Sequence, residues 1–125
     1  MFQLDFKSGV PICDQIVNGF IKLKSLGVIK GGDQLPSVRT LASKFSVNPN
    51  TVQKSYAMLE ANGIIYSVKG KGSFMSDDDN AANAVIEAAK SNFLSAAYSA
   101  LDLGLKPTEM INLIKENLIS EENSK

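Results

Sequence analysis

The 125-residue chain has no histidine, a single cysteine (Cys13) and a single arginine (Arg39). Without histidine there is no Ser-His or Cys-His catalytic pair and no imidazole to bind a metal. A lone cysteine cannot form an intramolecular disulfide, which fits a reducing cytoplasm. The apolar runs are too short to span a bilayer, and the N-terminus lacks the pattern of a signal peptide. We therefore expect a cytoplasmic protein with no membrane segment, no cofactor and no metal.

Three features could still suggest catalysis or ligand binding. The run Asp77-Asp78-Asp79 could bind a hard cation weakly, but no spaced acidic loop accompanies it, and a solvated linker is the better interpretation. The "GKGS" stretch fails as a P-loop, because Ile65 stands where the first glycine is needed and Gly72 where Ser or Thr is needed. Cys13 follows an apolar neighbour in an amphipathic segment, which favours packing over nucleophilic chemistry. We predict that the protein is not an enzyme.

Charge is unevenly distributed along the chain, although the total is zero. Residues 1–76 hold nine basic and four acidic side chains, a formal charge of +5, and residues 77–125 hold four basic and nine acidic ones, a charge of −5. A basic first part suggests an anionic partner. A merely solvated surface is the alternative that charge alone leaves open.

Apolar residues recur at helical spacing in three segments of the basic part. The first follows Pro11 and ends at Gly27, with Ile12, Ile16, Phe20 and Leu23 on one face. The second starts after the N-cap Ser37, with Val38, Leu41, Ala42 and Phe45 buried. After the break Ser46-Val47-Asn48, a third helix is capped by Asn48, has Pro49 at its first position, buries Val52, Tyr56 and Leu59, and ends at Gly63.

A β-hairpin is predicted directly after the third helix. Residues 64–68 are β-prone, residues 69–72 form a turn, and residues 73–75 return as the second strand. The loop at residues 31–37 has room for two or three extended residues. Two short helices across a tight turn, followed by a hairpin, predict a winged helix-turn-helix domain over residues 1–76. The fold class is mainly α with a small β-hairpin.

Residues 77–125 are predicted to form a pair of helices, one from about Asn80 to Leu103 and one starting near Pro107 or Thr108. Their apolar stripes are long for so little remaining chain. They could fold back onto the first domain, but a homodimer is favoured because a two-fold symmetric reader matches a palindromic DNA site. The predicted dimerisation residues are Ile86, Phe93, Ala97, Leu101, Ile111, Ile114 and Leu118.

Polar and basic residues cluster where a helix-turn-helix protein meets DNA. The third helix keeps its apolar side for the core, so its polar N-terminal end is free to enter a major groove. Arginine can fork onto guanine or phosphate, and lysines at a hairpin tip can neutralise phosphates. An ordinary exposed helix, a surface arginine and a solubilised glycine turn are the alternatives. The predicted DNA-binding residues are Ser37, Arg39, Thr40, Asn48, Asn50, Thr51, Gln53, Lys54, Lys69, Gly70 and Lys71.

The segment from Gly32 to Phe74, "GDQLPSVRTLASKFSVNPNTVQKSYAMLEANGIIYSVKGKGSF", resembles the winged-helix domain of the GntR family of bacterial transcription regulators. "VNPNTV", the earlier "PICDQI" and the short helical tail resemble its YtrA subfamily. The resemblance implies a small homodimeric regulator, usually a repressor and often of a transporter operon, that binds an inverted-repeat operator in double-stranded DNA. Cys13 departs from the pattern, since an aromatic residue is common there.

Carried over by position, the resemblance implies that Arg39 contacts a base or phosphate. It also implies contacts from the recognition helix and the wing by Asn48, Asn50, Thr51, Lys54, Gly70 and Lys71. The chain has no room for the effector domain of larger relatives. A small-molecule effector between the C-terminal helices stays open, although no residue marks its site. The main functional alternative is a winged helix that binds a protein and not DNA.

Overall fold

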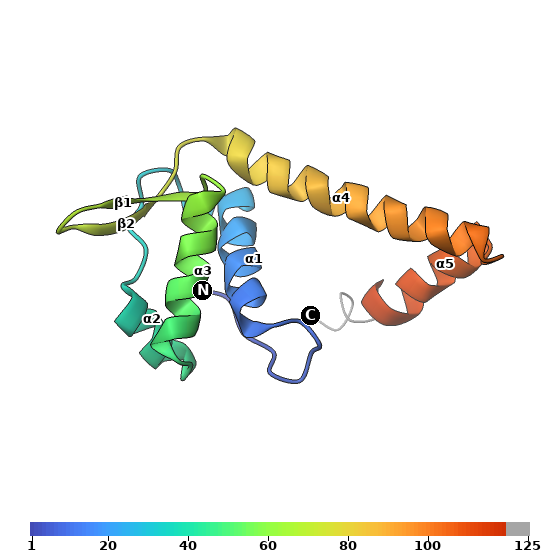
Figure 1. The fold of residues 1–125 in the computed structure, drawn as a ribbon, viewed down its shortest axis with the longest axis horizontal. Coiled ribbons are helices and arrows are strands. Elements are labelled where there is room, and N and C mark those ends of the chain that lie inside the picture. The colour runs from blue at the N-terminus through green and yellow to red at the C-terminus, as the bar shows by residue number, and fades with distance from the viewer. Residues whose placement is uncertain (120–125) are drawn as a thin grey trace. The chain divides into compact units, whose positions relative to one another are not determined.

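The computed structural model describes residues 1–119, which divide into two compact units, Met1–Ala84 and the residues from Val85 onward. The architecture is mainly helical with one antiparallel hairpin, so the predicted fold class is confirmed (Figure 1). The elements in chain order are α1 (Ile12–Ser25), α2 (Val38–Phe45), α3 (Pro49–Ala61), β1 (Ile65–Val68), β2 (Gly72–Met75), α4 (Asp79–Asp102), α5 (Pro107–Ile114) and the π-helical η1 (Lys115–Ile119).

The core of the first unit forms where α1 and α2 pack against α3. Phe20 of α1 is fully buried and makes edge-on ring contacts with Phe2, at 5.2 Å between centroids, and with Tyr56 of α3, at 5.9 Å. The apolar stripes predicted for the three helices supply this core, although Val38 and Phe45 of α2, expected to be buried, are only half-buried. Its other fully buried apolar side chains include Ile16, Leu41, Val52, Leu59, Ile64 and Met75.

Tyr56 ties the segment before α2 to the core. Its hydroxyl donates a 2.6 Å hydrogen bond to the carbonyl of Pro36, and burial raises the pKa of this phenol well above its usual range. The folded protein therefore favours the neutral phenol of Tyr56, which can donate this hydrogen bond. Because the folded pKa lies above that of the unfolded chain, the stabilisation is complete below pH ~10 and declines as the pH rises further.

We therefore expect Tyr56→Phe to lower the free energy of unfolding at pH 7 by about 1–2 kcal/mol, since the half-buried carbonyl of Pro36 loses its hydrogen-bond partner. The difference from the unmodified protein should narrow above pH ~10, where the phenol of the unfolded chain ionises. Urea unfolding at several pH values measures both effects. Tyr66→Phe is the matched control, because Tyr66 is 42% exposed and should change stability little. A constant difference from pH 7 to 11 would contradict the assignment.

The turn between α2 and α3 is built from local capping. Ser37 Oγ accepts from the backbone N–H of Thr40 at 3.1 Å, which starts α2. Ser46 ends α2 in the left-handed region, with φ 56°, and Asn48 Oδ1 then accepts from the N–H of Asn50 at 2.8 Å. Both predicted N-caps are confirmed, and Pro49 is the first residue of α3 as expected.

Pro11, expected in the first turn of α1, instead lies just before it as the N-cap residue.

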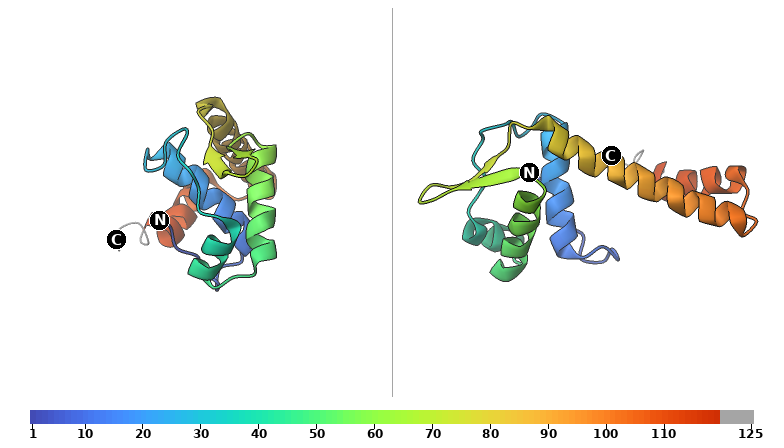
Figure 2. Two further views of the ribbon diagram at one scale, coloured as in Figure 1. Left: turned by 90° about the vertical axis from the view of Figure 1, so that its left-hand side faces the viewer. Right: turned by 45° about the horizontal axis from the view of Figure 1, so that its top comes forward.

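The hairpin gains a short third partner from the loop before α2. β1 and β2 pair antiparallel from Ile65↔Met75 to Val68↔Gly72, and Gln34 forms a β-bridge with Phe74. Further backbone bonds along this edge join Gly32 N to Met75 O at 2.7 Å and Leu35 N to Ser73 O at 2.9 Å. The extended residues expected in this loop are thus present. The hairpin projects away from the three helices of its unit (Figures 1 and 2).

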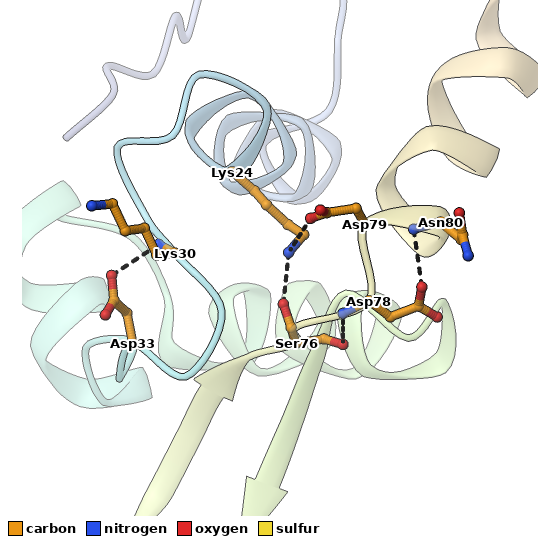
Figure 3. A network of polar contacts seen from close by, with 7 residues as sticks. All are labelled: Lys24, Lys30, Asp33, Ser76, Asp78, Asp79 and Asn80. Carbon is orange, nitrogen blue, oxygen red and sulfur yellow. Dashed lines mark hydrogen bonds and ion pairs between the residues drawn. The ribbon is translucent and has the colours of Figure 1, made fainter.

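The acidic run before α4 is anchored and is more than a solvated linker (Figure 3). Lys24 of α1 has a side chain that is only 5% exposed; its ammonium lies 2.6 Å from Ser76 O and 3.3 Å from Asp79 Oδ1. Asp78 Oδ1 accepts from the N–H of Asn80 at 2.9 Å, which caps the start of the helix. With Ala82 also buried, the first turns of α4 belong to the winged-helix unit.

Cys13 packs between α1 and α3, as its apolar setting predicted. Its sulfur lies 3.4 Å from Met58 Sδ and 3.3 Å from Ser55 Oγ. Ser55 is the one buried polar residue in the part of the chain that is described, and its hydroxyl also lies 3.0 Å from the carbonyl of Thr51. The thiol is half-buried in this contact between helices.

In the second unit, α4 ends before Gly104, whose φ of 99° is in the region that favours glycine. Glu109 Oε1 accepts from the N–H of Lys106 at 3.1 Å and caps α5. The regular α-helix ends at Ile114, earlier than the predicted stripe to Leu118, and continues as the π-helical η1. Several apolar side chains of this unit remain exposed, among them Phe93 at 57%, Leu101 at 42%, Ile111 at 50% and Leu118 at 59%.

Candidate nucleic-acid interface

The start of α2 presents an exposed basic group. Arg39 lies in its first turn and is exposed, and its guanidinium has no hydrogen-bond or ion-pair partner within residues 1–119. Ser37 and Thr40 flank it, and the hydroxyl of Ser37 lies 2.8 Å from that of Thr40. Ser37 is thus engaged as a cap, while the arginine fork is left free for an anionic or base partner.

The N-terminal half of α3 places its polar residues outward. Val52, Ser55, Tyr56 and Leu59 face the core, so Asn50, Gln53 and Lys54 are exposed. Thr51 is half-buried, and Asn48 is exposed although its side-chain oxygen caps the helix. The first turn of α3 also carries the positive end of the helix dipole, although its backbone N–H groups at Asn50, Thr51 and Val52 are already bonded to Asn48. An anionic or hydrogen-bonding partner would find side-chain donors here.

The hairpin formed by β1 and β2 is the wing of the domain, and its tip is a turn at residues 69–71 that carries two lysines. The N–H of Lys71 donates to Val68 O at 2.9 Å and closes the turn, in which Gly70 has φ 77°. A residue with positive φ at the third position is what a type II turn requires, so glycine is needed there. Lys69 and Lys71 are exposed, and neither ammonium has a partner in the described residues.

A groove of about 510 Å³ lies between the outer face of α3 and the hairpin. It is lined by five members of the predicted set, namely Ser37, Gln53, Lys69, Gly70 and Lys71. The remaining six lie outside its lining, in the first turn of α2 and around the start of α3: Arg39, Thr40, Asn48, Asn50, Thr51 and Lys54. The groove thus brings together five of the predicted residues from three segments of the sequence, namely the start of α2, the recognition helix α3 and the hairpin turn.

Two residues of this groove were not singled out by the sequence. Gln34 lies beside the wing, where its side-chain amide donates to Lys71 O at 2.7 Å. Glu60, in the last turn of α3, accepts from the hydroxyl of Ser67 at 3.2 Å and links the helix to β1. The sequence offers no signal for either contact beyond a polar residue at each position, because both depend on how the hairpin docks.

Helix, turn, recognition helix and wing in this order define a winged helix-turn-helix protein. A family model described as "Bacterial regulatory proteins, gntR family" matches residues 24–75. Over 111 residues the chain is 32% identical to YhcF of Bacillus subtilis, an uncharacterized HTH-type transcriptional regulator, and covers 92% of that protein. The chain belongs to the GntR family of transcription regulators. The resemblance stated from the sequence is thereby confirmed, and membership agrees with the prediction that it is not an enzyme.

The chain is also 44% identical to the HTH-type transcriptional repressor YtrA of Bacillus subtilis, over 70% of its own length and 65% of that protein. A solved GntR family transcriptional regulator from Listeria monocytogenes is 35% identical, with a TM-score of 0.66 over 89% of this chain and 98% of the other. A transcriptional antiterminator from Listeria monocytogenes superposes over all of this chain and 90% of its own, with 31% identity and a TM-score of 0.74.

Several similar structures are complexes with DNA, all of them of AraR. The AraR DNA-binding domain, solved in complex with operator ORE1, is 27% identical, with a TM-score of 0.52 over 61% of this chain and 95% of its own. Among residues 1–119, no group of three or more His, Cys, Asp or Glu side chains is placed to hold a metal ion. No helix in the same range is long and apolar enough to cross a membrane.

Proposed function

We propose that this regulator is a homodimeric, cytoplasmic repressor that binds an inverted-repeat operator, as part of the control of a transporter operon. DNA binding is supported above all by four exposed cations that have no hydrogen-bond or ion-pair partner within residues 1–119: Arg39 at the start of α2, Lys54 on α3, and Lys69 and Lys71 in the turn of the hairpin. Unpaired cations attract phosphates, and polar side chains at the start of a recognition helix reach base edges.

In this mechanism α3 enters a major groove from its N-terminal end. Asn50 and Gln53 would bond base edges, since amide side chains can both donate and accept. Arg39 would fork onto a guanine or a phosphate, and the wing lysines would neutralise flanking phosphates. Glu60 in the groove repels phosphates, so it would keep the backbone toward the lysine side of the wing. The operator complex of the similar AraR domain supports this use of the fold.

Dimerisation would use the apolar faces of the second unit. Phe93, Leu101, Ile111 and Leu118 are exposed, while Ile86, Ala97 and Ile114 are half-buried. Large contiguous apolar surface is unfavourable in water, so a second copy is the occupant that we propose. Two copies related by a two-fold axis would read the two halves of an inverted repeat. Repression is supported by the name of the relative YtrA, and the link to a transporter operon by the family resemblance alone.

The test is selection of bound sequences from a random duplex pool with the purified full-length protein. Enrichment of an inverted repeat would support both specific binding and a two-fold dimer. The spacing of its half-sites should match about one helical turn of DNA, or a multiple of it. Absence of any enriched sequence at low salt would overturn the proposal and would favour a protein partner for the winged helix.

Lys71→Ala and Asn50→Ala are expected to separate phosphate contact from base readout. Removing the wing ammonium should weaken binding to all sequences and reduce the slope of log K against log salt by about one unit. Removing the Asn50 amide should instead relax the preference at one operator position and cost about 1–3 kcal/mol on the selected sequence. Fluorescence anisotropy with the operator and single-base variants measures both. Equal loss on every sequence for both variants would refute base readout by Asn50.

A further inference from the structure

We propose that Gln34 is a positioning residue that holds the wing tip in the shape that presents Lys69 and Lys71. This inference rests on the proposed role of the wing in DNA binding. Gln34 belongs to neither strand of the hairpin and is not one of the residues predicted to contact DNA. It lies in the loop before α2 and reaches the tip from the side.

The backbone around Gln34 is already fixed to β2. Gln34 pairs with Phe74 in a β-bridge, Met75 N donates to Asp33 O at 2.8 Å, and Leu35 N donates to Ser73 O at 2.9 Å. From this fixed point the side chain extends along β2, and its amide Nε2 donates to Lys71 O at 2.7 Å. A short, well-placed hydrogen bond thus connects the body of the domain to the tip.

The tip needs such a connection because its own backbone is permissive. Lys71 stands between Gly70 and Gly72, which have φ of 77° and 115°, and glycine loses more conformational freedom on ordering than any other residue. A hairpin of two short strands is only marginally stable by itself in water. With Gln34 in place, both backbone groups of Lys71 are engaged, the N–H by Val68 O and the carbonyl by the amide.

The local packing fits this role. A Cβ added at Gly72 would lie 3.0 Å from Gln34 Nε2, so the amide approaches the strand where glycine leaves room for it. On the other side of the hairpin, the bond between Ser67 and Glu60 holds β1 to the end of α3. Strand β1 is therefore held to α3 at Ser67, one pair before the turn, and the turn itself is held by Gln34. Order at the tip should depend on the second contact.

An ordered tip should bind more tightly than a mobile one. DNA binding immobilises the wing, and ordering a loop or side chain costs affinity unless the free protein is already ordered. Loss of Gln34 should thus weaken binding without removing any phosphate contact in the complex. We expect a lower affinity for DNA at every salt concentration and an unchanged slope of log K against log salt. Loss of a lysine should instead reduce that slope.

The experiment uses full-length protein with Gln34→Ala, Gln34→Met and Gln53→Ala. Backbone ¹⁵N relaxation without DNA measures order at Gly70, Lys71 and Gly72, and anisotropy measures operator affinity from low to high salt. We expect both Gln34 variants to lower the order parameters of the tip from about 0.85 to below about 0.6. Operator affinity should fall about three- to tenfold, and the plots of log K against log salt for the variants and the unmodified protein should have the same slope. Gln53→Ala, a glutamine lining the same groove, should leave the order of the tip unchanged.

The outcomes are separable. Unchanged tip order in both folded Gln34 variants would overturn the inference, and so would a disordered tip with undiminished affinity. A lower salt slope with unchanged tip order would mean that Gln34 contacts DNA directly, which also overturns it. If the unmodified protein bound no DNA sequence, the proposed function would fail, while tip order alone would still decide whether Gln34 holds the wing. Thermal unfolding of each variant confirms that it is folded.

Discussion

Truncation after Ala84 is expected to yield a folded monomer that binds the operator about 10²- to 10⁴-fold more weakly than the full chain. In a dimer, binding of one head raises the effective concentration of the second head at the other half-site. The truncated chain keeps the winged helix intact, because the Lys24–Asp79 ion pair and the buried Ala82 lie before the cut. A cut at residue 76 would remove both and confuse folding with assembly.

Analytical ultracentrifugation and operator titration of the same samples provide the test. Phe93→Glu and Leu101→Glu in the full chain should have the same effect as the truncation, since each places a charge in the proposed interface. Asn92→Glu is the matched control, because it adds the same charge at an exposed polar position next to Phe93. If the truncated chain still sedimented as a dimer, the second unit would not be the dimerisation region.

Arg39→Ala is expected to reduce operator affinity about 10- to 100-fold, which corresponds to about 1–3 kcal/mol for one good guanidinium contact. The guanidinium is exposed and has no partner within residues 1–119, so its removal should leave the stability of the fold nearly unchanged. The loss in affinity can then be assigned to the complex. If the guanidinium makes a bidentate contact, Arg39→Lys should recover little of the lost operator affinity, because an ammonium cannot form a bidentate contact.

Lys44→Ala provides the control for charge alone. Lys44 lies in the last turn of the same helix, is exposed and likewise has no ion-pair partner in the described residues. Its removal lowers the net charge by the same unit, so long-range attraction changes equally in the two variants. We expect an effect within about twofold for a cation that makes no phosphate contact. If both variants lost the same affinity, the site assigned to Arg39 would be wrong.

The sequence predicts the elements of the winged helix well because their signals are local. Asn48 and Pro49 place the start of α3 correctly, since capping depends on a few neighbouring residues. The same holds for Ser37 and for the glycine turn of the hairpin. Burial of one face of each helix follows from its apolar spacing, which the core confirms.

Contacts between segments far apart in the chain were not predictable in this way. The Gln34–Lys71 bond joins a loop to a turn 37 residues later, and the Lys24–Asp79 pair joins the end of α1 to the start of α4. No spacing rule connects such positions, because the partners meet only once the hairpin and helices have packed. For this reason the sequence favours a solvated linker for the run Asp77-Asp78-Asp79, whereas in the structure Asp79 forms an ion pair with the buried ammonium of Lys24.

The single thiol gives this protein a built-in reporter. Cys13 is half-buried against Ser55 and Met58 of α3, so the contact between α1 and α3 shields part of its thiol from a reagent. A change in the rate of thiol modification therefore reports a change in the contact that supports the recognition helix. No engineered label and no removal of other cysteines is required, because the sequence holds only this one.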